Sequence, residues 1–218
     1  MSSDGPLRSW RPSYRAQATG PAVGLLVALM LSVACRNRPP DDPRDYAGEI
    51  AATRAAKDAA FKTASDSPVA ENRRAELLPL AYFPIDPLYK TAAVLRLSSD
   101  STILQVATST GGIRQMRRVG KLEFALKGQP LTLTAFAEVG ASDLTHLFVP
   151  FADLTTGNET YPGGRYLDLV RNATGIYEID FNRAYFPYCY YSPTYECPYP
   201  PAENRLRIPI RAGERFRT

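Results

Sequence analysis

The segment KLEFALKGQPLTLTAFAE, residues 121–138, alternates apolar and polar side chains on both sides of a Gly-Gln-Pro turn. Leu122, Phe124 and Leu126 precede this turn, and Leu131, Leu133 and Ala135 follow it in alternation with two threonines. Side chains of a β-strand point alternately to opposite faces, so this period of two predicts an antiparallel hairpin with one buried face.

Further short segments show the same period or a continuous apolar run: AAVLRLS, TILQVAT, IRQMRR, THLFVPF, RYLDLV, GIYEIDF and RLRIPIR. Many short strands joined by tight turns favour an antiparallel sandwich or barrel. The last segment contains Pro209, which has no N–H to donate to a sheet, so we expect an edge strand there. The expected fold is mainly β and, with two N-terminal helices, α+β overall.

Two helices are expected within residues 46–80, before the strands begin. The segment YAGEIAATRAAKDAAFK is rich in alanine and places Tyr46, Ile50 and Phe61 near one stripe. Ser67 and Pro68 are typical of the start of a second helix. We therefore expect a single domain over residues 46–218, with its β part at 88–218.

The first 34 residues have the pattern of a signal peptide. Arg8, Arg11 and Arg15 form a basic region, and the uncharged run GPAVGLLVALMLSVA ends at Ala34. That run is shorter than the roughly 20 residues of a membrane span. LSVAC resembles the bacterial lipoprotein box, which makes Cys35 the expected lipidation site and residues 35–45 a tether. An uncleaved N-terminal anchor is the alternative.

This reading predicts a lipid-anchored, extracytoplasmic protein of the cell envelope, whose partner is the membrane. In a host with two membranes, Arg36 after the lipidated cysteine favours the periplasmic side of the outer membrane. The formal net charge is only +4, and part of it lies in the N-terminal basic region, so the charge gives no indication of nucleic-acid binding.

The other two cysteines, Cys189 and Cys197, are close in sequence in a chain expected to be exported, so we expect a disulfide. Closing that short loop would stabilise the fold by about 2–3 kcal/mol. Metal ligation is less favoured, because His146 is the only histidine and lies in an apolar strand that indicates a core position. A Cys–His nucleophile is a further alternative without an identifiable third partner. We expect no metal and no cofactor.

The same region, residues 180–206, is dense in aromatic rings and prolines. Its rings either bury area in a loop without regular hydrogen bonding or form a platform on which a ligand stacks. The two roles are compatible, because a stiff loop loses little entropy on binding. The rings are Phe181, Tyr185, Phe186, Tyr188, Tyr190, Tyr191, Tyr195 and Tyr199.

Polar side chains flank this region and the glycine-rich turn before it. Glu159, Tyr161 and Arg165 lie around the turn, where Arg165 either clamps an anion or pairs with Glu159 or Asp168. The aromatic segment is bracketed by a second set, whose carboxylates either act as acid and base or pair with nearby arginines. This set is Asp180, Asn182, Glu203, Asn204 and Arg205.

Four segments resemble the bacterial and archaeal family of the domain of unknown function 1684. They are YFPIDPLYK (82–90), ATSTGGIRQMRRVGKLEFALKGQPLTLTAF (107–136), LFVPFADLTTGNETYPGGRYLDL (147–169) and IDFNRAYFPYCYYSPTYECPYPPAENRLRIPIRAGE (179–214). The family pattern has asparagine-proline where this chain has Phe186-Pro187, which weakens any role of a side chain at position 186. The resemblance implies a family without an established activity.

The sequence contains no catalytic triad order, phosphate-binding loop or dinucleotide fingerprint, so an enzyme is not favoured. We expect a ligand-binding or envelope-associated module that takes a small-molecule, glycan or peptide ligand. Its site is expected in the groove between residues 157–168 and the aromatic segment. One alternative is a hydrolase with Asp180 or Glu203 as general base. Another is an interaction protein that docks a partner on its aromatic loop.

Overall fold

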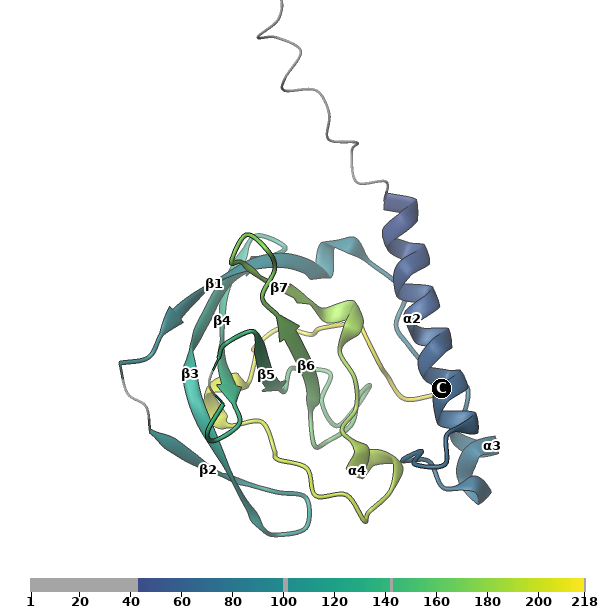
Figure 1. The fold of residues 1–218 in the computed structure, drawn as a ribbon. Coiled ribbons are helices and arrows are strands. Elements are labelled where there is room, and N and C mark those ends of the chain that lie inside the picture. Colours follow the sequence, from purple (N-terminus) through teal and green to yellow (C-terminus); the bar gives the residue numbers. More distant parts are fainter. Residues whose placement is uncertain (1–42, 100–101, 142, 218) are drawn as a thin grey trace, which may run out of the picture. The chain divides into compact units, whose positions relative to one another are not determined.

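An antiparallel sheet curls around the main hydrophobic core in the computed structural model of the chain (Figure 1). The structure describes residues 43–99, 102–141 and 143–217; the expected signal peptide, Cys35 and most of the tether lie outside them. The strands run in the order β6-β5-β4-β3-β1-β7, and β2 pairs with β3 outside this path. They are β1 (Lys90–Leu97), β2 (Ile103–Ala107), β3 (Ile113–Leu126), β4 (Gln129–Ala137), β5 (His146–Phe151), β6 (Arg165–Val170) and β7 (Tyr177–Asp180).

The chain that follows β7 brings the two edges of this sheet together. The N–H of Tyr166 in β6 donates to the carbonyl of Tyr185 at 2.9 Å, and the N–H of Tyr185 donates back at 3.1 Å. This reciprocal pair makes an antiparallel bridge, so the sheet is nearly a closed barrel. The mainly β, antiparallel fold is thereby confirmed, and of the two expected architectures the structure has the barrel-like one.

The hairpin expected at residues 121–138 is present as β3 and β4, with Leu122 opposite Leu133. One expectation is corrected here, because IRQMRR and KLEFAL form one continuous strand rather than two. The register shifts between Arg118 and Gly120, which is a β-bulge. A Cβ at Gly120 would lie 2.1 Å from the carbonyl oxygen of Arg96, so only glycine fits between β3 and β1 there.

The first helix, α2 (Pro43–Thr63), buries Ile50 and Phe61 as the sequence predicts. The second is much shorter than expected: a 3-10 turn, η1 (Glu71–Arg73), leads into α3 (Arg74–Leu77). Ser67 does not cap it. Its hydroxyl accepts from the N–H of Val69 at 3.1 Å and donates to the carbonyl of Phe61 at 2.7 Å, so it holds a turn after α2 instead.

The segment RLRIPIR is not the edge strand that its alternation predicts. The N–H of Leu206 donates to the carbonyl of Ala152 at 2.8 Å, and the carbonyl of Ile208 accepts from Leu154 at 3.3 Å. Pro209 interrupts the donors after that, so the segment lies along the 152–154 loop without building a ladder. Its apolar side still faces inward, since Leu206 and Ile210 are buried.

The remaining helices are single turns between longer elements. They are η2 (Pro87–Tyr89), η3 (Phe181–Arg183), α4 (Tyr188–Tyr191) and η4 (Ala202–Asn204). Two of them, η3 and α4, lie in the aromatic segment, and η4 lies in the chain that follows it. Within the described ranges, the helices are too short or too polar to cross a membrane.

Buried side chains form one large core and two smaller clusters. The large core contains the inward-facing residues of the barrel, such as Leu122, Leu133 and Leu167. A second cluster joins Phe61 of α2 to Phe186 and Tyr191 of the aromatic segment. The third lies under β2 and contains Met116 and Phe136. The second and third clusters border the cavity described next.

Candidate functional site

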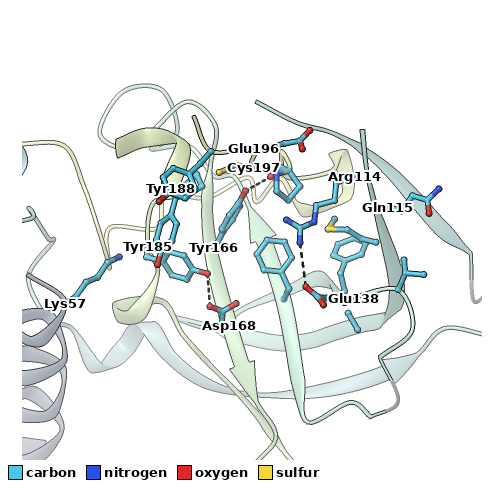
Figure 2. A pocket seen from close by; sticks show the side chains of 18 of the residues that line it. Lys57, Arg114, Gln115, Glu138, Tyr166, Asp168, Tyr185, Tyr188, Glu196 and Cys197 are labelled. Atoms are coloured by element: carbon cyan, nitrogen blue, oxygen red, sulfur yellow. Dashed lines mark hydrogen bonds and ion pairs between the residues drawn. The ribbon is translucent and has the colours of Figure 1, made fainter. Parts of the chain in front are cut away.

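A cavity of about 940 Å³ lies on the outer face of the barrel, between strands β3 to β6 and the aromatic segment (Figure 2). Alternation along β6 explains its position. Arg165, Leu167 and Leu169 belong to the buried interior, whereas Tyr166 and Asp168 point to the other face, where they line the cavity. Sequence neighbours on β6 therefore contribute to opposite sides of the sheet.

The register of the sheet assembles the cavity floor. Phe136 of β4 lies opposite Phe148 of β5, and Phe148 lies opposite Asp168 of β6. Directly opposed residues share a face, so these three side chains form a row across three strands. The ring of Phe148 meets that of Tyr166 edge-on, with centroids 4.7 Å apart. The floor is thus aromatic and carries one carboxylate.

The aromatic segment supplies the facing wall with Tyr185, Tyr188 and Tyr195. The rings of Tyr188 and Tyr195 are 5.3 Å apart and nearly perpendicular, and the ring of Tyr185 is perpendicular to that of Tyr166 at 5.8 Å. The hydroxyl of Tyr185 donates to Oδ2 of Asp168 at 2.7 Å, and that of Tyr166 donates to the carbonyl of Pro198 at 2.7 Å. Hydrogen bonds therefore hold both rings in place.

Burial raises the pKa of Tyr185, and the neighbouring charge of Asp168 raises it further. Burial likewise raises the pKa of Tyr166 and of Tyr188. These phenols are consequently neutral at physiological pH. They act in the cavity as apolar rings and hydrogen-bond donors rather than as anions.

Helix α2 closes one end of the cavity with Lys57 and Phe61. The ammonium of Lys57 pairs with the buried carboxylate of Glu214 at 2.5 Å. Glu214 also accepts from the hydroxyl of Tyr191 and from the N–H of Phe186, both at 2.7 Å. Position 186 thus contributes its backbone N–H to this network, while its side chain packs in the second cluster.

The two cysteines of the aromatic segment lie next to each other. Both are free thiols in this structure, and the N–H of Cys189 donates to the sulfur of Cys197 at 3.2 Å. The hydroxyl of Tyr161 lies 3.9 Å from the sulfur of Cys189. The hydrogen bond from Cys197 is the main cause that lowers the pKa of Cys189 to about 6, and the same bond raises the pKa of Cys197. The expected disulfide stays a prediction.

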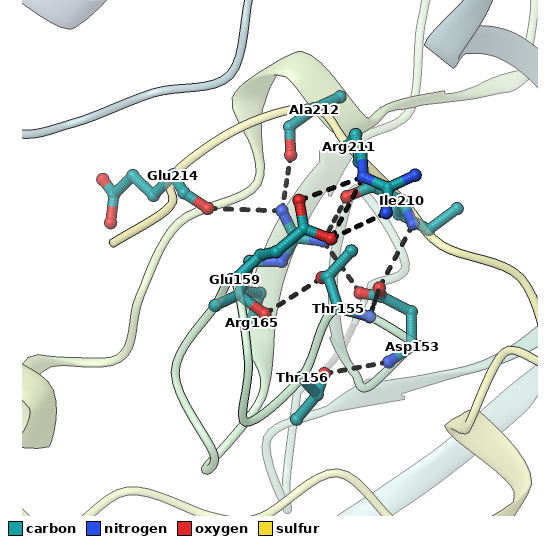
Figure 3. Close-up of polar contacts among 10 residues, drawn as sticks. Asp153, Thr155, Thr156, Glu159, Arg165, Ile210, Arg211, Ala212 and Glu214 are labelled. Atoms are coloured by element: carbon teal, nitrogen blue, oxygen red, sulfur yellow. Dashed lines mark hydrogen bonds and ion pairs between the residues drawn. The ribbon is translucent and has the colours of Figure 1, made fainter. Parts of the chain in front are cut away.

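Arg165 lies on the inner side of the sheet, away from the cavity, and is completely buried. Figure 3 shows its polar contacts. Its guanidinium pairs with Oδ2 of Asp153 at 2.8 Å. It also donates to the carbonyls of Ile210, Ala212 and Glu214, at 2.7, 2.5 and 3.3 Å. Of the two roles considered for Arg165, an ion pair is present, but its partner is Asp153 rather than Glu159 or Asp168. The guanidinium exposes no surface to a ligand.

Gly164 lets Arg165 reach this position. Its φ of +82° lies in the left-handed region, and a Cβ there would come within 2.7 Å of the carbonyl oxygen of Phe151. Asp153 completes the site from the other side, because its Oδ1 accepts from the N–H groups of Thr155 and Ile210 at 2.7 and 3.1 Å. The buried pair thus joins the 153–165 loop to the C-terminal segment.

Asp180 and Asn182 also serve the fold. The hydroxyl of Tyr46 in α2 contacts both carboxylate oxygens of Asp180 at 2.9 and 3.0 Å, and Arg183 pairs with the same carboxylate at 3.3 Å. The amide of Asn182 donates to the carbonyl of Asp86 and accepts from its N–H, at 2.9 and 3.0 Å. Asn182 borders a smaller cavity of about 280 Å³ beside α2. The bonds of Tyr46 attach α2 to the end of β7, and those of Asn182 attach the turn at Asp86 to the same place.

The three residues after the aromatic segment separate in space. Asn204 is buried and bridges β4 and β5, donating to the carbonyls of Thr134 and Pro150 at 2.8 and 2.7 Å. Glu203 is exposed and pairs with Arg118 at 2.7 Å. Arg205 is exposed, and its backbone forms the bridge with Ala152.

Glu159 and Tyr161 lie near each other in the chain but have different partners. The carboxylate of Glu159 accepts from the guanidinium of Arg211 at 3.0, 3.0 and 2.8 Å, and these hydrogen bonds lower the pKa of Glu159. Tyr161 is half-buried, with its ring 5.4 Å from that of Tyr190. The eight polar candidates therefore occupy several places, and the cavity lining in the described structure contains none of them.

The sequence correctly indicated the aromatic segment and the 157–168 region as neighbours, since Tyr166 and Asp168 face Tyr185. It missed the contribution of β3 and of the end of β4, where Arg114 and Met116 of β3 and Glu138, the residue after β4, line the cavity. The alternation of RYLDLV could have pointed to Asp168, a carboxylate two residues from a tyrosine on the same face. His146 is another correction: it is exposed at the start of β5 rather than in the core.

Comparisons with known proteins agree with this fold. The model of the family described as "Protein of unknown function (DUF1684)" matches residues 76–215. A solution NMR structure of an uncharacterized protein from Haloarcula marismortui is 35% identical and superposes with a TM-score of 0.63. That match covers 82% of this chain and 98% of the other. Among curated proteins, no sequence matches the chain significantly. The chain belongs to the DUF1684 family of proteins of unknown function.

Proposed function

We propose that this protein is an extracytoplasmic ligand-binding module, attached to a membrane through a lipid on Cys35, whose ligand occupies the outer-face cavity. The observation that carries this proposal is the cavity itself. Its volume of about 940 Å³ suits a small organic molecule, and its walls combine aromatic rings with a few polar groups. The ligand is a small molecule with apolar groups that pack on these rings, because the floor and the facing wall are aromatic.

The rigidity of the walls supports binding. Tyr185 and Tyr166 are held by hydrogen bonds at 2.7 Å, so their rings lose little freedom when a ligand packs against them. Pro187 and Pro198, which also line the cavity, restrict the backbone at both ends of the segment that carries Tyr188 and Tyr195. A preformed wall of this kind converts more of its contact energy into affinity.

The alternative of a hydrolase finds less support. Asp180 is buried and already engaged by Tyr46, Asn182 and Arg183. Glu203 is exposed and paired with Arg118. A general base needs a lone pair that faces a substrate, and neither carboxylate lies in the cavity lining. The alternative of a docking platform is weaker too, because Tyr185, Tyr190 and Tyr191 are partly or fully buried.

A titration with the fluorescent apolar probe N-phenyl-1-naphthylamine tests ligand binding. We expect one saturable site in the wild type and at least about fivefold weaker binding in Tyr188→Ala, which removes a wall ring. Tyr199→Ala is the matched control. Tyr199 is 39% exposed, close to the 43% of Tyr188, and belongs to the same segment but not to the cavity lining. Equal binding by all three proteins, or no saturable site, contradicts the proposal.

Membrane attachment has its own experiment, detergent phase partitioning of protein expressed in its host. The lipid on Cys35 predicts that the wild type enters the detergent phase and that Cys35→Ala does not. Partitioning that is the same for both would assign any membrane attachment to something other than this cysteine.

A further inference from the structure

The charges around the cavity indicate what kind of ligand it takes, if the proposed function is correct. Five charged side chains line it: the cations Lys57 and Arg114 and the carboxylates of Glu138, Asp168 and Glu196. Two positive and three negative groups leave one net negative charge, although the whole chain carries +4. The net charge of the cavity lining is therefore opposite in sign to the net charge of the whole protein.

Ion pairing makes the net charge of the cavity more negative still, because both of its cations are paired. Lys57 is neutralised by Glu214 at 2.5 Å, and Arg114 by Glu138 at 3.6 Å. Asp168 and Glu196 form no ion pair with any cation in the described part of the chain. Asp168 accepts from the hydroxyl of Tyr185, and Glu196 accepts from Thr108 and Thr110 at 2.7 and 3.2 Å. Neutral donors orient both carboxylates but leave their charge uncompensated.

The aromatic rings beside Asp168 also attract a cation. The face of an aromatic ring carries partial negative charge, and a cation within about 6 Å of its centre is attracted. Perpendicular rings enclose a corner rather than a flat surface, and both Phe148–Tyr166 and Tyr166–Tyr185 have this geometry, with interplanar angles of 79° and 89°. Asp168 lies directly opposite Phe148 in the sheet, so the carboxylate and the rings border the same space.

The protein's own ammonium group lies over one of these rings, that of Tyr185. The Nζ of Lys57 lies 5.0 Å from the ring centre of Tyr185 and 5.1 Å from that of Phe61. Lys57 occupies one end of the cavity. The lining also contains Asp168 and the rings of Phe148 and Tyr188.

We propose that the cavity binds a small organic cation of the tetraalkylammonium class, with its charged head beside Asp168 and against the aromatic rings. A methylated ammonium fits this combination better than a primary amine. Its methyl groups pack on rings without needing hydrogen-bond acceptors, while its charge is attracted by both the rings and the carboxylate. Glu196 contributes long-range attraction from the opposite wall.

Displacement of bound N-phenyl-1-naphthylamine by two compounds of equal shape tests this inference. Choline carries the trimethylammonium head, and 3,3-dimethylbutan-1-ol replaces its nitrogen by carbon and is neutral. We expect choline to displace the probe at a concentration at least about tenfold lower than the alcohol. Asp168→Asn keeps the acceptor for Tyr185 but removes the charge, so it should reduce that ratio severalfold. Asp143→Asn, the same change at an exposed carboxylate outside the cavity, should leave it unchanged.

The outcomes separate this inference from the proposed function. If the two compounds displace the probe equally, or if neither does while the probe itself binds at Tyr188, the cavity binds ligands but not as a cation site. If the ratio is high but is the same in Asp168→Asn, the selectivity does not come from this carboxylate and the inference is wrong. If the probe does not bind at all, the proposed function fails first.

Discussion

The buried pair of Arg165 and Asp153 is the residue-level feature that joins the 153–165 loop to the C-terminal segment. Both side chains are completely buried. Asp153 accepts hydrogen bonds from the N–H groups of Thr155 and Ile210, and Arg165 donates to the carbonyl of Ala212. The guanidinium has four acceptors in fixed positions, so it ties together two segments that no β-ladder joins. Burial lowers the pKa of Arg165, and the charge of Asp153 counteracts this effect. The pair is a structural connection rather than a ligand clamp.

Removing one partner of this pair should destabilise the protein strongly. We expect Arg165→Ala to lower the free energy of unfolding by about 3–5 kcal/mol, because Asp153 is left buried without a counter-charge. Urea unfolding followed by circular dichroism measures the effect. Arg211→Ala, which breaks only the exposed pair with Glu159, is the control and should remain close to the wild type. If Arg165→Ala has normal stability but no longer binds ligand, Arg165 is an anion clamp rather than a structural connection.

At the scale of elements, the aromatic segment combines a wall of the cavity with a reactive thiol pair. Cys197 lines the cavity, and Cys189 lies near the start of α4. The two thiols share a hydrogen bond, so one proton is lost easily and the second is held more tightly. In an oxidising compartment the same proximity favours the disulfide that the sequence predicts.

The thiol pair predicts an unusual pH profile in the reduced protein. With a pKa of about 6, Cys189 is mostly thiolate at pH 7, so its rate of alkylation by iodoacetamide should level off above pH 7. In Cys197→Ala the hydrogen bond is lost, and the rate should keep rising towards an ordinary thiol pKa of about 8.5. Mass spectrometry of the labelled protein measures both rates. A wild-type profile that rises beyond pH 8 contradicts the shared bond.

A count of free thiols in the exported, unreduced protein tests the disulfide itself. The sequence predicts that neither Cys189 nor Cys197 reacts before reductant is added. Two reactive thiols in that sample would show that the disulfide has not formed, which contradicts the prediction.

Element by element, the sequence was most informative where a segment is stabilised by its own periodicity. The β3–β4 hairpin and helix α2 could be predicted because alternation and alanine content act locally. The second helix and the strand at RLRIPIR could not. Ser67 bonds back to Phe61, and the carbonyl of Ala152 captures the N–H of Leu206, so tertiary partners decide the structure of both segments.

At the scale of the whole molecule, the two faces of one sheet have different roles. The inner face packs the core, and the outer face of β3 to β6 forms the floor of the cavity. Sequence periodicity shows which residues share a face, but it does not show that the outer face is covered by residues 185–198 and by α2. The polar candidates were therefore expected around one groove, while the structure distributes Arg165, Asp180 and Asn204 among separate structural contacts.

Helix α2 precedes the segment matched by the family model, which begins at residue 76, yet it supplies Lys57 and Phe61 to the cavity. Its attachment depends on long-range contacts, such as the bond from Tyr46 to Asp180 and the ion pair of Lys57 with Glu214. The binding site we propose therefore belongs to the 43–217 unit as a whole.

The most direct test of the ligand-binding account is an NMR map of the ¹⁵N-labelled protein titrated with a panel of soluble ring-bearing and ammonium compounds. The account predicts saturable amide shifts that cluster at residues 114–116, 136–139, 148, 166–168 and 185–198, and that weaken in Tyr188→Ala. Shifts that cluster on another surface, or a panel without any saturable response, would contradict it.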